Sequence, residues 1–361
     1  MFVAMKIAAL TLVVAGVMGS NTEENEEPHL AIRTGLKCSQ CHVNRTGGGA
    51  RTEFGGVYGQ TQLPAVTEGF QFQNRALNDF VSIGANVRVR GNAFVTDADP
   101  RTSLDIQKAD VMIEARLIRR VLALYIDESV GPGQATAREL FGIVEGLPLN
   151  GYAKAGKFFL PYGLRLVDDR EFIRDVTGFN MNTPDQGVEV GIEPGPLSVF
   201  LAVTNGTGGA AEGDDSKQVT GSAALVTRRF RIGGSASHNQ TGTMTRDVVG
   251  GFGGVNLGPV NLLGEFDYIL GSDAGGAELD QFVAFGEGNL WLAKGVNAKV
   301  AYGYHDRNMD VPEDQRTRMR LGLEVFPIPF LQASGYFTIF DDIPQAPGQQ
   351  DQASLELHFF F

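Results

Sequence analysis

The segment that decides the fold reads RTRMRLGLEV over residues 316–325. Threonine, methionine, leucine and valine occupy every second position, and mostly charged residues lie between them. This two-residue period is typical of a β-strand with one apolar and one polar face. Residues 82–90, 111–118 and 352–361 repeat the pattern. The sequence therefore predicts strands from about residue 80 to the last residue.

The connections between such segments alternate in length. Short connections with glycine, proline or paired basic residues lie at 119–120, 148–150, 194–196, 228–229, 258–259, 294–295 and 327–329. Longer polar loops fall between them, among others at 206–217, 271–278 and 305–315. Short turns on one side and long loops on the other are typical of an outer-membrane barrel. About sixteen strands fit between these connections. With an even number of strands, the barrel begins and ends on the same side of the membrane, which is the periplasmic side.

A soluble β-sandwich also has strands with one apolar face, so it is the alternative to a barrel. The polar faces here carry rows of charge, such as Arg88 and Arg90, which suit a wet lumen. Aromatic residues such as Trp291 fall near strand ends, and the last strand ends at Phe361, which resembles bacterial outer-membrane porins. We therefore expect residues 80–361 to form an all-β, transmembrane antiparallel β-barrel of about sixteen strands.

The overall composition excludes some classes of protein. The chain has 361 residues and a net charge of −12 at pH 7, which argues against nucleic acid as a partner. Apart from the N-terminal segment, the sequence has no run of 18 apolar residues, so a helical membrane protein is not indicated.

The first twenty residues have the features of a secretory signal peptide. Lys6 is followed by a short apolar run at 7–17, and the small residues Gly19 and Ser20 offer a cleavage point. An uncleaved anchor helix is the alternative. We expect residues 1–20 to be removed, which would expose the mature chain to an oxidising compartment.

A cofactor motif follows at Cys38-Ser39-Gln40-Cys41-His42, which holds the two cysteines of the chain. In a C-x-x-C-H run, two thiols bond covalently to a haem and the histidine becomes the proximal iron ligand. A redox disulfide and half of a zinc site are alternatives. The sequence has no second C-x-x-C for zinc and no βαβ pattern for a redox protein, so the motif predicts one covalent haem c.

A second axial ligand is needed for stable electron transfer. His29, nine residues before Cys38, is the nearest candidate, although it could equally be a solvated side chain. His358, on the polar face near the periplasmic end, is its rival, and Met112 is a further option.

Other residues near the motif are less specific. Arg45 and Arg51 flank a glycine cluster and would pair with haem propionates or stay solvated. Phe54 and Tyr58 would share a helix face and pack either on the porphyrin or in a small core. The segment 161–184 is the longest interruption between strands. It could form a constriction loop inside the lumen, an outer binding surface or a plain solvated loop.

A signal peptide, one C-x-x-C-H and a porin-like barrel together resemble the fused outer-membrane cytochrome c–porin proteins, of which the iron oxidisers are the best-known members. The resemblance implies that Cys38 and Cys41 are the thioether residues and that His42 is the proximal ligand. It also implies three parts: a signal peptide at 1–20, a monohaem segment at 21–79 as plug or cap, and the barrel at 80–361. The stretch Thr46-Gly47-Gly48-Gly49 is richer in glycine than expected of iron oxidisers.

The function expected on these grounds is electron transfer across the bacterial outer membrane. Single electrons would pass between an extracellular donor or acceptor, with ferrous iron as one candidate, and a periplasmic cytochrome or other carrier. The protein would then be an electron carrier or an iron-oxidising oxidoreductase. The alternatives are a diffusion porin whose haem segment gates or senses, and a structural barrel with a Cys38–Cys41 disulfide.

Overall fold

The computed structural model describes residues 27–94, 101–166, 168–241, 244–272, 278–341 and 351–361. The signal peptide expected at residues 1–20 lies outside this part of the chain. No helix of the described residues is long and apolar enough to cross a membrane.

The described chain begins with three short helices and continues with sixteen strands. The helices are α2 Pro28–Thr34, α3 Cys38–Cys41 and α4 Glu53–Thr61, with a 3-10 turn Pro148–Asn150 and α5 Phe172–Asp175 further on. The first eight strands are β1 Val81–Phe94, β2 Arg101–Ile118, β3 Leu122–Gly131, β4 Thr136–Leu147, β5 Gly151–Phe158, β6 Asp185–Ile192, β7 Leu197–Thr204 and β8 Gln218–Val226. The other eight are β9 Phe230–Thr241, β10 Met244–Leu257, β11 Val260–Gly271, β12 Gln281–Ala293, β13 Val296–Asp306, β14 Gln315–Val325, β15 Leu331–Asp341 and β16 Gln352–Phe360.

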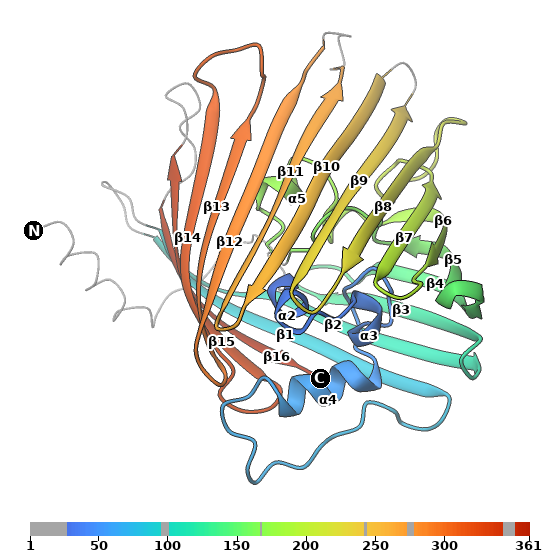
Figure 1. Cartoon of the computed structure of the whole chain (residues 1–361), viewed down its shortest axis with the longest axis vertical. Helices are drawn as coiled ribbons and strands as arrows, with labels where there is room; N and C mark the ends of the chain where they lie inside the picture. The colour runs from blue at the N-terminus through green and yellow to red at the C-terminus, as the bar shows by residue number, and fades with distance from the viewer. Residues whose placement is uncertain (1–26, 95–100, 167, 242–243, 273–277, 342–350) are drawn as a thin grey trace, which may run out of the picture.

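These strands form one closed barrel in which each strand pairs antiparallel with its neighbour in sequence. β1 and β16 close it, with Arg88 opposite His358 and Arg90 opposite Glu356. Arg90 and Glu356 also form an ion pair of 2.6 Å across this seam. The expected all-β antiparallel barrel of sixteen strands is confirmed for the described residues (Figure 1).

The alternation in the sequence sets which side chains face outward. Large apolar side chains cover the outer surface, for example Val87, Ile113, Leu201, Leu262, Leu321 and Leu357. The residues between them face inward and are buried although many are charged, for example Arg88, Glu114, Arg318, Arg320 and Glu356. Because a strand alternates its side chains between two faces, one sequence pattern gives an apolar outside and a polar inside.

The connections also divide as the sequence indicates. Each even-numbered strand from β2 to β14 runs into the next through a short turn, whereas longer segments separate β5 from β6, β7 from β8 and β13 from β14. Backbone hydrogen bonds pair Phe361 with Ala85, so the last residue lies beside the start of β1. The chain therefore enters and leaves the barrel at the end that has the short turns.

The segment between β5 and β6, residues 159–184, folds into the barrel and is called the lumen loop below. Of the three interpretations of this segment, the structure agrees with the one that places it in the lumen. Its carboxylates meet arginines of β14: Asp168 lies 2.5 Å from both Arg318 and Arg320, and Glu171 lies 2.8 Å from Arg318. Its apolar residues join one core with inward side chains of β10 to β13 and with Ile32 of α2. This core contains Leu164, Leu166, Phe172, Ile173, Val248, Phe252, Leu263 and Val283. The loop and the N-terminal segment thus fill part of the lumen with apolar contacts.

Raising the pH from 5 to 8 is expected to weaken the docking of this loop. Burial raises the pKa of Glu171 from 4.5 to about 7; Arg318 opposes this shift and Asp168 adds to it. Because the folded state holds the proton more tightly, this stabilisation is complete below pH 4.5 and is lost as the pH rises through 7. The difference corresponds to at most about 3 kcal/mol.

The measurement is the melting temperature at pH 5 and pH 8. Glu171→Gln keeps a neutral side chain at both values, so its melting temperature should fall less than that of the wild type. Glu313→Gln, at an exposed loop position, should behave as the wild type does. Equal pH dependence in Glu171→Gln and the wild type would rule out this role.

Candidate haem site

The N-terminal segment owes its shape to local capping. Helix α2 ends at Gly35, whose φ of 67° is left-handed and whose N–H donates to Ala31. Helix α4 starts at Thr52, whose hydroxyl accepts from the N–H of Gly55. The Cβ of any residue larger than glycine at position 55 would lie 2.2 Å from the carbonyl oxygen of Cys41. Gly55 therefore lets α4 pack directly on α3.

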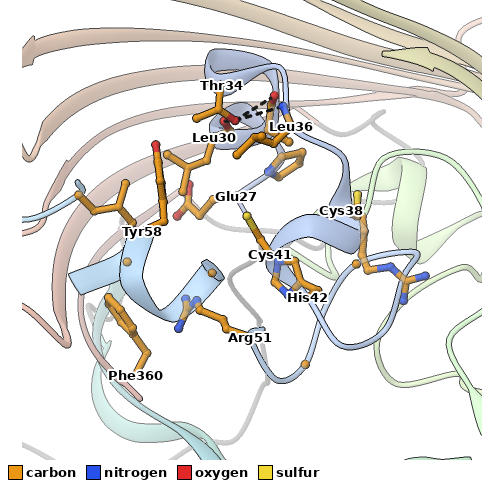
Figure 2. Close-up of a pocket in the computed structure, with 18 of the residues that line it drawn as sticks. Glu27, Leu30, Thr34, Leu36, Cys38, Cys41, His42, Arg51, Tyr58 and Phe360 are labelled. Carbon is orange, nitrogen blue, oxygen red and sulfur yellow. Dashed lines mark hydrogen bonds between the residues drawn. The ribbon is translucent and has the colours of Figure 1, made fainter. Parts of the chain in front are cut away.

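Helix α3 is a single turn that presents the C-x-x-C-H residues to one cavity. Residues three apart lie on the same side of a helix, so both thiols face the same way. The two cysteines are not bonded to each other. Both cysteines and His42 line the cavity, as Figure 2 shows.

The glycine cluster after the motif is a turn that only glycine makes without strain. Gly47, Gly48 and Gly49 all have positive φ, at 106°, 88° and 63°. A Cβ on Gly47 would touch the sulfur of Cys38 at 3.6 Å, and one on Gly49 would overlap the hydroxyl of Tyr125. The turn therefore brings the backbone close to the thiols and anchors the segment on strand β3.

The cavity has a volume of about 1360 Å³, including the part open to solvent. The apolar walls come from the N-terminal segment, the lumen loop and the barrel, with Leu30, Leu36, Tyr58, Leu63, Leu164, Phe326 and Phe360. The sequence predicts that Phe54 and Tyr58 share a helix face and pack on the porphyrin or in a small core. Tyr58 lines the cavity, whereas Phe54 of the same helix is half exposed.

Positive charge dominates the lining. Six basic residues line the cavity, namely Lys37, Arg51, Arg88, Lys108, Arg165 and Arg231, and Glu27 is the carboxylate in the same lining. Arg231 lies 3.9 Å from the sulfur of Cys38 and Arg165 donates to Thr46, so these cations lie close to the motif. Such a lining suits a dianionic group that is apolar at its centre, which is the character of a haem with two propionates.

The two arginines singled out from the sequence have different surroundings. Arg51 lines the cavity and its guanidinium stacks 4.4 Å from the ring centre of Phe360. Arg45 instead pairs with Glu193 at 2.7 Å and with Glu145 at 3.0 Å. Arg45 therefore attaches the segment to the barrel wall and is not part of the lining.

The ionisation of His42 suits it to binding a metal, whereas Cys41 stays protonated. Burial lowers the pKa of His42 to about 4, and the nearby charge of Arg51 adds to this, so the imidazole is neutral at physiological pH. Backbone groups of Gly48 and Gly49 interact with the ring and partly oppose this lowering of the pKa. Burial raises the pKa of Cys41 to about 11, with Cys38 contributing, so this thiol stays protonated until it reacts.

His358 lines the same cavity from the inward face of β16. Its Nδ1 lies 3.1 Å from the side-chain oxygen of Gln332, and the amide nitrogen of Gln332 donates to Glu27 at 2.9 Å. Nε2 lies 3.2 Å from the side-chain oxygen of Asn86, so each ring nitrogen faces an amide oxygen. A hydrogen bond donated by Nδ1 to Gln332 would orient the ring as in metal-binding histidines and would leave Nε2 for a metal. Arg88 lies 3.4 Å from this Nε2.

His29 has a different location from the one expected of a haem ligand. It is fully buried beside Glu27, Glu287 and Glu324, and it is not among the residues that line the cavity. Its role as a sixth ligand stays a prediction that no observation here tests. Met112, the other option, packs in a core with Tyr125 and Phe141.

Several lining residues were not singled out from the sequence. Lys108, Arg165, Arg231 and Gln332 lie between 60 and 300 residues away from the motif in sequence, and their inward positions follow only from the strand registers and the lumen loop. Alternation alone places Lys108 and Gln332 on inward faces. It does not indicate how far along the barrel axis they lie relative to the haem motif.

Comparison with known proteins gives the fold and nothing finer. No family model matches the chain, and no curated protein matches its sequence. Among solved structures, OmpT of Vibrio cholerae is 13% identical, with a TM-score of 0.63, over 78% of this chain and 99% of that one. The anion-selective porin from Comamonas acidovorans is 10% identical, with a TM-score of 0.61, over 78% and 99%. This chain has the porin fold.

The OmpF structure of Salmonella typhi in complex with daunomycin is similar in the same way. It is 11% identical, with a TM-score of 0.60, and the match covers 78% of this chain and 97% of that one. Sequence identities this low support the barrel architecture and leave the chemistry of the lumen to the residues of this chain.

Proposed function

We propose that this chain is an outer-membrane barrel that holds one covalent haem c at its periplasmic mouth and passes single electrons. The observation that carries this proposal is that Cys38, Cys41, His42 and His358 line one large cavity with six basic residues. The residues present therefore fit a haem in charge and bonding groups.

Each group of residues has a distinct role in this proposal. When bound, haem supplies a one-electron Fe(II)/Fe(III) couple. Cys38 and Cys41 would hold the macrocycle through thioethers, and His42 and His358 would each offer a ring nitrogen to the iron. Arg51, Lys108 and the other basic residues of the lining neutralise the propionates. The apolar side chains exclude water, which disfavours side reactions.

The location follows from the surface of the barrel. An outward face rich in leucine, valine and isoleucine suits lipid, and a closed barrel leaves no unpaired strand edge in the bilayer. In outer-membrane barrels the short turns face the periplasm. A periplasmic cytochrome would thus meet the cavity directly, and an extracellular donor, with ferrous iron as the first to try, would reach it through the lumen.

Electron transfer across liposome membranes tests this function. The purified chain is reconstituted in liposomes that enclose cytochrome c, and a ferrous chelate or an impermeant organic reductant is added outside. Reduction of the enclosed cytochrome should be fast with the wild type and at least ten-fold slower with Cys38→Ser/Cys41→Ser. Equal rates would show that the reductant passes through an open pore and that no haem is needed.

Replacing His358 with alanine is expected to convert the haem from six to five coordination. The side chain is on β16, and among the described residues it is the one histidine besides His42 in the lining, so no other imidazole would replace it. We expect a shift from a low-spin to a high-spin absorption spectrum and a haem that binds carbon monoxide readily. An unchanged low-spin spectrum would exclude His358, and the same measurement on His29→Ala would then test the other candidate.

A diffusion porin with a haem-bearing gate is the second candidate. The porin fold and the similarity to an anion-selective porin favour it. The apolar core formed by the lumen loop and Ile32 favours a plugged barrel instead. The two candidates differ in ion conductance, which is large for a porin and small for a plugged conduit.

A further inference from the structure

We propose that Glu27, His29 and Glu324 form a site for one divalent transition-metal ion, next to the haem cavity but separate from it. One nitrogen of His29 and one oxygen of each glutamate lie within 4.8 Å of one another. The cluster joins the start of α2 to the periplasmic end of β14, and of these residues Glu27 is the one that also lines the haem cavity.

The first support is the state of His29. The side chain is 0% exposed, and neither ring nitrogen has a well-formed hydrogen bond among the described residues. Nδ1 lies 2.9 Å from a carboxylate oxygen of Glu27 and 3.8 Å from one of Glu287, and Nε2 lies 3.9 Å from one of Glu324. An ion would bind one of the two nitrogens, and one nitrogen lies within 4.8 Å of a carboxylate oxygen of both Glu27 and Glu324. Ligands at about 2.1 Å from a metal are separated from each other by about 3 Å or more, so this spacing suits neighbouring ligands of one ion.

The second support is charge. Three carboxylates, those of the buried Glu287 and Glu324 and of the half-buried Glu27, surround the ammonium group of Lys299. This group lies 2.7 Å from Glu324 and 3.3 Å from Glu27. With a neutral imidazole, the formal charge of the cluster is −3 + 1 = −2. Burying uncompensated charge is costly, and a divalent cation offsets this charge fully.

The carboxylates are also held in place from outside the cluster. Gln332 donates to Glu27 at 2.9 Å, and Asn297 donates to Glu324 at 2.9 Å. Tyr336 donates to the other oxygen of Glu324 at 2.5 Å. Hydrogen bonds of this kind orient metal ligands and are part of built sites. One imidazole with two carboxylates suits zinc, ferrous iron or cobalt, and the absence of thiolate among these three ligands disfavours copper(I).

The test measures metal binding by the full, haem-loaded chain in detergent. After chelator treatment, Zn²⁺ is titrated calorimetrically, and bound zinc and iron are counted by elemental analysis. We expect one zinc per chain in addition to the haem iron, with at least ten-fold weaker binding in His29→Ala and in Glu324→Gln. His238→Ala, at an exposed histidine paired with Asp247, should bind as the wild type does.

The outcomes separate this site from the haem and from a plain ion-pair cluster. His29→Ala should keep the haem absorption spectrum of the wild type, because His29 does not line the cavity. If His29→Ala fails to fold, the zinc affinity of Glu324→Gln, which keeps the side-chain shape, decides the question. Undetectable zinc binding, or binding unchanged in both variants, would overturn the proposal and leave a protonated His29 as the group that balances the charge.

Discussion

Replacing His42 with alanine is expected to abolish the low-spin haem spectrum and electron transfer across the membrane while the barrel stays folded. His42 is neutral, half-buried and lines the cavity together with both thiols, so no other residue of the motif replaces its nitrogen. Cys38 and Cys41 should still hold the macrocycle. The measurements are the reduced spectrum, the rate of cytochrome reduction in liposomes, and far-ultraviolet circular dichroism for the barrel.

Rescue by free imidazole distinguishes an iron ligand from a residue that only supports the fold. Imidazole should enter the space left by the His42 side chain and restore the low-spin spectrum of the alanine variant. His238→Ala, at an exposed position on β9 opposite Asp247, should change neither spectrum nor rate. Full electron transfer by the His42→Ala chain without added imidazole would contradict the account.

Replacing Arg174 with alanine is expected to open the lumen to ions. The Arg174 side chain is almost fully buried, pairs closely with Glu265 of β11 and donates to the carbonyl of Phe179 at 2.9 Å. Its loss leaves Glu265 buried without this partner, which costs about 3–5 kcal/mol. The lumen loop should then leave its site against Val248, Leu263 and Val283 of the barrel wall, and single-channel conductance in planar bilayers should rise at least several-fold.

A double variant shows whether the ion pair itself is responsible. Arg174→Ala/Glu265→Gln removes both charges, so it should recover much of the melting temperature that the single variant loses. If the wild type already shows porin-sized steps and Arg174→Ala does not raise them, the loop does not plug the barrel. The diffusion porin would then be the better function.

Much of the barrel could be predicted from the sequence because its cause is local. A period of two residues decides which side chains face lipid, as Leu321 and Arg320 show on β14. Short turns such as 294–295 and 258–259 fix where strands end. The path of the lumen loop could not be predicted, because its position depends on Asp168 meeting Arg318 and Arg320, about 150 residues further along the chain.

The candidate site divides in the same way. Cys38, Cys41 and His42 are adjacent in sequence, so their shared cavity follows from one helical turn. The residue opposite them depends on how the segment docks in the barrel. His29 is close to Cys38 in sequence but packs among carboxylates, whereas His358 is far in sequence and reaches the cavity through the β1–β16 seam. Spacing along the chain does not carry this information.

The central claim, a covalent haem on Cys38 and Cys41, is tested most directly by staining for haem after denaturing electrophoresis, with a reduced-minus-oxidised spectrum of the native protein. The account predicts stain that survives denaturation at the mass of the chain, a c-type reduced band, and loss of both in Cys38→Ser/Cys41→Ser. A colourless wild-type protein of the right mass would contradict it and leave a porin-fold barrel with an unused pair of thiols.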